Sequence, residues 1–189
     1  MTSRKHPPQP YENRLWRAGY AWSSFQGVVD VCDYILMGGI QPGANIYYPL
    51  CATITMLYAR PFKRSKGIES LTMQFVPKKF LRLHRQLILV RDQTSAHSDA
   101  SKDAARFKGL PANNVRLFVR NGGNEVALGM NQVTFKTTAI LEIRDLASAL
   151  AKRMLEYIRN VASQYPDDIP DGEYRIDLTT GTFRRQLNH

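Results

Sequence analysis

A long amphipathic pattern near the end of the chain is the feature that most constrains its fold. Between residues 137 and 161, apolar side chains recur at steps of three and four, which places them along one side of a helix. Thr137 or Thr138 is positioned to cap the start of this helix. The pattern predicts a long helix with one buried face, formed by Ile140, Ile143, Leu146, Ala147, Leu150, Met154, Tyr157 and Val161.

Three further segments have the same helical spacing. Residues 12–37 predict a helix that Asn13 could cap and that ends at the glycine pair 38–39. Residues 46–60 predict a second helix, which begins near Pro49 and stops before Pro61. Residues 78–96 predict a third, opened by the proline at position 77. The first of these helices contains a seven-residue ladder of Leu15, Trp22, Val29 and Leu36.

The period changes to that of strands in two places. Residues 115–135 alternate around an Asn-Gly-Gly-Asn turn, which predicts a β-hairpin inserted before the last helix. Because an isolated hairpin is marginally stable in water, we expect it to pack on the bundle or on a partner. Residues 173–184 predict a short β or irregular tail. With a polar, proline-rich and disordered lead at residues 1–10, the prediction is one mainly α domain over residues 11–189, a bundle of four principal helices.

The charge of the chain favours a polyanionic partner. Twenty-six Lys and Arg face sixteen Asp and Glu, giving a net charge of +10. Such an excess suits RNA or DNA through neutralisation of phosphates, although a protein can also be basic without binding either. The densest basic cluster is formed by Lys63, Arg64 and Lys66 beside Phe62, where a phosphate backbone and a stacked base could bind. The alternative for this cluster is a solvated loop.

Residues 80–99, FLRLHRQLILVRDQTSAHSD, carry the most specific functional pattern. Arg91 is followed directly by Asp92 and, after five intervening residues, by His97. Read as a helix, the stretch places the arginine and the histidine on either side of an apolar stripe. This spacing resembles the R-x(4–6)-H motif of the HEPN superfamily of small helical-bundle proteins. The apolar stripe is Phe80, Leu83, Leu87, Val90 and Thr94.

The resemblance implies a fold, an activity and partners. It implies a HEPN-like bundle that acts as a homodimer and cleaves RNA without a metal or other cofactor, in phage defence or a toxin–antitoxin system with an antitoxin protein. Arg91 would hold the phosphate, His97 would transfer the proton, and Asp92 would orient the arginine. Many relatives in the superfamily have lost activity, so a non-catalytic module that binds RNA or a protein partner is the alternative.

The residue types suit this chemistry. Histidine, with an ordinary pKa near 6.5, can donate or accept the proton of a ribose 2′-hydroxyl reaction. Arginine has a planar, always-charged fork that matches a phosphate. His84 lies two turns before Arg91 and could line the site, but a core histidine bonded to a neighbour is the alternative. Arg91 could instead form a buried ion pair with an aspartate of the first helix, Asp30 or Asp33.

The remaining features exclude other classes of protein. No run of apolar residues is long enough for a transmembrane helix, and the polar start of the chain lacks the core of a signal peptide, so we expect a cytoplasmic protein. Cys32 and Cys51 lie among apolar neighbours and are expected to be reduced, buried thiols rather than a disulfide. No cysteine and histidine cluster has metal-ligand spacing, so no metal site is expected.

Overall fold

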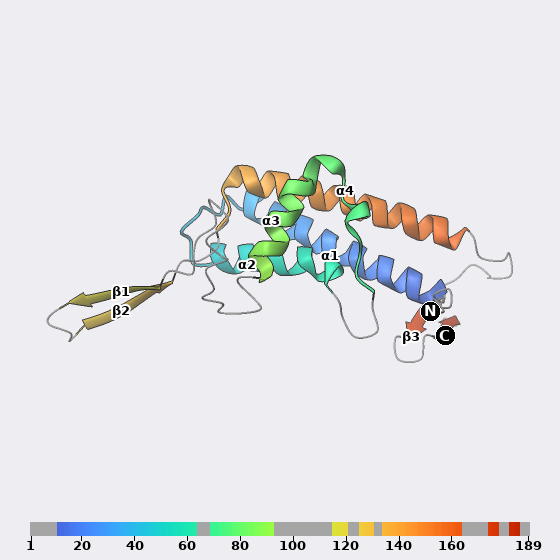
Figure 1. Cartoon of the computed structure of the whole chain (residues 1–189), viewed down its shortest axis with the longest axis horizontal. Coiled ribbons are helices and arrows are strands. Elements are labelled where there is room, and N and C mark those ends of the chain that lie inside the picture. Colours follow the sequence, from blue (N-terminus) through green and yellow to red (C-terminus); the bar gives the residue numbers. More distant parts are fainter. Residues whose placement is uncertain are drawn as a thin grey trace, which may run out of the picture.

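The computed structural model of the chain describes residues 11–63, 69–92, 115–120, 125–130, 134–163, 174–177 and 182–185. The predicted disordered lead at residues 1–10 lies outside these ranges. Within them the protein is mainly helical, and the prediction of a helical bundle is confirmed (Figure 1). The α-helices of the described residues are α1 (Tyr11–Met37), α2 (Tyr47–Ala59), α3 (Leu81–Arg91) and α4 (Thr137–Ala162).

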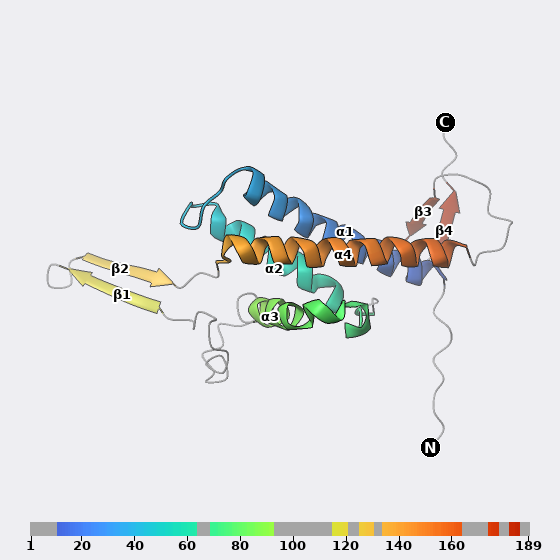
Figure 2. The same cartoon turned by 90° about the horizontal axis from the view of Figure 1, so that it is seen from above.

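The two longest helices, α1 and α4, form the main layer of the bundle. They run alongside one another over most of their length, and no other pair of described elements packs so extensively (Figures 1 and 2). The predicted face of α4 is buried, with Tyr157 at its partly exposed margin. It meets a buried face of α1 that contains Ala21, Phe25, Val28, Cys32 and Ile35.

Helix α2 packs on α1, and α3 packs mainly on α2. Seen from above, α3 lies to one side of the α1–α4 layer (Figure 2). Leu87 of α3 reaches the common core, whereas Arg82, Arg85 and Gln86 of the same helix are exposed. One face of α3 therefore anchors it to the bundle, and the opposite face is open to solvent.

A short connection ties the end of α2 to both long helices. The end of α2 continues as the 3₁₀ turn η1 (Arg60–Phe62), and the amide of Leu71 donates to the carbonyl of Pro61 at 2.8 Å. Arg17 of α1 pairs with Glu69 at 3.0 Å. Arg153 of α4 donates to the carbonyl of Phe75, in the turn η2 (Met73–Phe75), at 2.8 Å. These contacts hold the segment that leads into α3 against the α1–α4 layer.

The structure corrects two predicted helix caps and one helix start. Asn13 lies inside α1, which begins at Tyr11, so it does not cap that helix. No threonine caps α4, because its N-cap is Lys136 and makes no side-chain capping bond. The chain before α4 is held by a tertiary contact instead, since the Tyr47 hydroxyl donates to the Phe135 carbonyl. The predicted third helix starts late, because residues 78–80 form the 3₁₀ turn η3 (Lys78–Phe80) before α3 begins at Leu81.

Two antiparallel strand pairs complete the described chain. Strand β1 (Val115–Arg120) pairs with β2 (Glu125–Met130), in a register that aligns Val115 with Met130. Strand β3 (Tyr174–Asp177) pairs with β4 (Thr182–Arg185). In both views β1 and β2 stand clear of the helices, so packing of this pair on the bundle is not seen (Figures 1 and 2).

The two cysteines lie in the core as free thiols, as the sequence predicts. Burial, with a smaller effect of the Asp33 charge, raises the pKa of the Cys32 thiol to about 12. It is therefore protonated and unreactive at neutral pH. Across the described ranges, no helix combines the length and the apolar character that a membrane crossing needs.

Candidate nucleic-acid interface

A cluster of aromatic rings positions the first part of the candidate site. Phe62 of η1 lies 5.8 Å from Phe25 of α1, 5.7 Å from Tyr58 of α2 and 4.6 Å from the His84 ring of α3, between ring centroids. Rings in such tilted and edge-to-face arrangements attract one another beyond their area burial. The cluster therefore fixes the end of η1, and with it Lys63, which follows directly.

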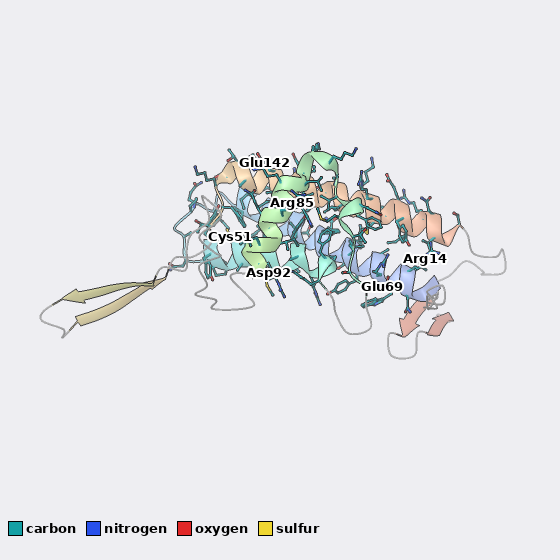
Figure 3. All side chains as sticks on the ribbon, in the orientation of Figure 1. Arg14, Cys51, Glu69, Arg85, Asp92 and Glu142 are labelled. Carbon is teal, nitrogen blue, oxygen red and sulfur yellow. The ribbon has the colours of Figure 1, made fainter. Side chains whose placement is uncertain are left out.

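Lys63, Arg91 and Asp92 meet at the end of α3. The Lys63 ammonium lies 2.6 Å from Oδ2 of Asp92, and Nη1 of Arg91 lies 3.1 Å from Oδ1 of the same carboxylate. Figure 3 shows Asp92 at one end of α3. The three side chains are between 28% and 40% exposed, so they form a half-buried cluster at the surface. We call Lys63, Arg91 and Asp92 the charged cluster.

The carboxylate is ionised within this charged cluster. Partial burial by itself raises the pKa of Asp92, but the hydrogen bonds and charges of Lys63 and Arg91 outweigh it and lower the pKa below its ordinary value. Because the three groups are partly solvated, each pair contributes about 0–1 kcal/mol to the free energy of unfolding. Asp92 therefore serves mainly to hold two cations in fixed positions, with one net positive charge left over.

His84 lies in the core instead of lining a cleft. Its side chain is buried, and its Nδ1 lies 2.8 Å from the Tyr58 hydroxyl. Burial, and to a lesser extent the charge of Arg85, lowers the pKa of His84. A neutral, buried and hydrogen-bonded imidazole cannot reach RNA. The burial of His84 and its bond to Tyr58 disfavour the predicted RNA-binding role and agree with the alternative of a core histidine.

The lowered pKa of His84 predicts a pH-dependent stability. His84 in the unfolded chain takes up a proton below about pH 6.5, whereas the folded protein resists this protonation. We therefore expect the free energy of unfolding to fall as the pH drops from 7.5 to 5. In urea unfolding curves, His84→Gln should make the free energy of unfolding depend less on pH over this range. The stability that the ionised Asp92 contributes should be lost only at lower pH, below its ordinary pKa near 4. The prediction would be contradicted if the free energy of unfolding fell equally with pH in the wild type and in His84→Gln.

The aspartates of α1 have other partners than the predicted Arg91. Asp33 accepts a hydrogen bond from Arg144 of α4, and Asp30 accepts one from Gln26 at 3.1 Å. Arg91 lies on α3, which packs mainly on α2, and it pairs with Asp92. The suggested buried ion pair between Arg91 and α1 is therefore wrong, and the guanidinium stays at the surface of the bundle.

The structure brings together three of the predicted site residues. These are the members of the charged cluster, contributed by α3 and by the chain just after η1. His97, Arg64 and Lys66 lie outside the described residues. Lys78, Lys79, Arg82 and Arg85 were not among the predicted site residues. The sequence does indicate these residues, because residues 70–91 contain Lys and Arg but no Asp or Glu.

Among the described side chains, no group of three or more His, Cys, Asp and Glu is placed to hold a metal ion. No protein-family model, no curated protein and no solved structure matches the chain.

Proposed function

We propose that this protein is an RNA-binding helical bundle that cleaves RNA without a metal, with Arg91 and His97 as its catalytic pair. The observation that supports the proposal is the charged cluster at the end of α3. It holds an arginine and a lysine, from two different elements, around one carboxylate. Two cations fixed in this way can bind the two oxygens of a phosphodiester as they bind the carboxylate.

Each residue has a distinct task in the proposed reaction. Arg91 has five N–H donors, and one of its nitrogens faces Asp92, which leaves other donors for a phosphate oxygen. These donors would stabilise the charge that develops on the phosphate as a ribose 2′-hydroxyl attacks. His97, which follows Arg91 by six residues, would take the hydroxyl proton or protonate the leaving 5′-oxygen. Asp92 and Lys63 would keep the guanidinium in place.

The resemblance to the HEPN superfamily supplies the setting of the proposal. In that setting two copies of the chain form a homodimer, and each contributes an Arg91 and a His97 to the site. The RNase would act in phage defence or as the toxin of a toxin–antitoxin system, with an antitoxin protein as a further partner. The helical fold and the position of Arg91 at the end of α3 are compatible with this assignment.

Cleavage of RNA in EDTA tests the proposal directly. We expect the wild-type protein to cleave total bacterial RNA in EDTA and to leave 2′,3′-cyclic phosphate ends, because the 2′-hydroxyl is the nucleophile. The double variant Arg91→Ala/His97→Ala, purified in the same way, controls for contaminating nucleases. Cleavage only by the wild type supports the assignment.

Two other outcomes would overturn the catalytic assignment. Binding of RNA without cleavage by folded wild-type protein would favour the non-catalytic module. Equal cleavage by the wild type and the double variant would show that any activity lies outside Arg91 and His97.

A further inference from the structure

The charged residues on the exposed face of α3 and of the turn before it are all basic. Lys78 and Lys79 of η3 and Arg82 and Arg85 of α3 are all exposed. None of the four forms an ion pair with any residue in the part of the chain that the structure describes. We call these four residues the basic stripe.

The basic stripe leads to the charged cluster. Arg82 and Arg85 are three residues apart and so lie on one side of α3. Asp92 follows Arg85 by seven residues in helical backbone geometry, which places it two turns further along nearly the same line, at about 10 Å. Figure 3 shows Arg85 part of the way along α3 and Asp92 at its end. Arg82 and Arg85 therefore share one side of α3 with Asp92 of the charged cluster, and Lys78 and Lys79 lie in the turn η3 directly before this helix.

The exposed face of α4 shows that such a stripe is not general in this protein. Its exposed charged residues mix both signs, as Glu142, Asp145, Lys152, Glu156 and Arg159 illustrate. An ordinary solvated face mixes signs in this way. On α3 the neighbouring cations repel one another, and a bound polyanion would relieve this repulsion.

We propose that the basic stripe binds the sugar–phosphate backbone of a single RNA strand and guides it to the charged cluster. The inference rests on the proposed function for the choice of RNA. A single row of cations suits one strand better than a duplex, whose two backbones flank a groove. The aromatic residue between Lys79 and Arg82 is Phe80, which is partly buried against the core and has the Lys79 ammonium 4.6 Å from its ring centroid. We therefore assign the contact to phosphates, which carry no base sequence.

The salt dependence of RNA binding tests this proposal. The probe is 2′-O-methyl RNA of mixed sequence, which has no free 2′-hydroxyl and cannot be cleaved during a titration. Each phosphate contact contributes about −0.7 to the slope of log K against log salt concentration on a single strand. The double variant Arg82→Gln/Arg85→Gln should therefore have a slope about 1.4 less steep than that of the wild type. The ratio of wild-type to variant affinity should then be about 25-fold larger at 0.1 M salt than at 1 M salt.

A matched variant separates this contact from a loss of net charge. Lys152→Gln/Arg159→Gln removes the same two charges from exposed positions of α4 and should leave the slope nearly unchanged. Equal slopes for the two double variants would overturn the proposal. So would a loss of binding to anionic lipid vesicles by the Arg82/Arg85 variant with RNA binding intact.

The binding titration and the cleavage assay fail independently. If the wild type does not cleave RNA but the Arg82/Arg85 variant shows the predicted change in slope, the basic stripe is supported and the catalytic assignment is wrong. If cleavage depends on Arg91 but the Arg82/Arg85 variant shows no change in slope, the catalytic assignment is supported and the basic stripe is wrong.

Discussion

Replacing Arg91 or His97 with alanine is expected to cause the largest loss of activity of any single change. Removal of one group that stabilises developing charge costs about 100- to 1,000-fold in rate, and removal of a general acid or base about 100- to 10,000-fold. We therefore expect metal-free cleavage to fall at least about 100-fold in each variant. Initial rates on a fluorescent RNA in EDTA would measure the loss.

The conservative variant Arg91→Lys distinguishes a catalytic arginine from a merely basic one. Lysine keeps the charge but lacks the planar fork, so we expect cleavage between that of the wild type and that of Arg91→Ala. Lys152→Ala on α4, a single exposed cation outside the proposed site, should cleave like the wild type. A similar loss in the Lys152 variant would contradict a specific role for Arg91.

Phe25→Ala is expected to cause the largest loss of stability argued from the structure. The ring is fully buried and lies 6.0 Å from Tyr58 and 5.8 Å from Phe62, between ring centroids. Emptying such a site costs about 3–5 kcal/mol, because contacts are lost and a cavity is left. For a chain of this size that corresponds to a fall in Tm of about 6–20 °C in calorimetry.

Trp22→Ala is the control for the Phe25 variant. Trp22 precedes Phe25 by three residues in α1 but is 39% exposed, so its removal should cost far less. Phe25→Ala should also weaken RNA binding at temperatures where it is folded, because Phe62 and hence Lys63 lose a support. Equal destabilisation by both variants would show that the aromatic cluster is not the centre of the core.

The long helices could be predicted from sequence because their signal is local. In α4 the apolar residues keep helical spacing from Ile140 to Val161, and in the structure both lie on its buried face. The end of α1 at Met37 follows from the glycine pair, where Gly39 has a φ of +58°. Helix caps were harder to predict, because the chain before α4 is held by the Tyr47 contact to Phe135, which joins residues far apart in sequence.

The site was predictable only in part for the same reason. Arg91 and Asp92 are neighbours in sequence, so their association could be anticipated from the motif. Lys63 lies 29 residues from Asp92 in sequence. It reaches the end of α3 because the neighbouring Phe62 packs against His84 and the other rings of the aromatic cluster. The partner of Asp33 is Arg144, on a helix that sequence spacing alone could not place next to α1.

The sequence by itself determined the helical class of this protein, the extent of its long helices and its strong positive charge, because spacing and composition are properties of the chain alone. The tertiary structure alone decided which charged residues meet. It buried His84 against Tyr58, gathered Lys63 and Arg91 around Asp92, and left Arg82 and Arg85 unpaired among the described residues on the open face of α3. Such contacts depend on how helices pack, and no local pattern specifies that.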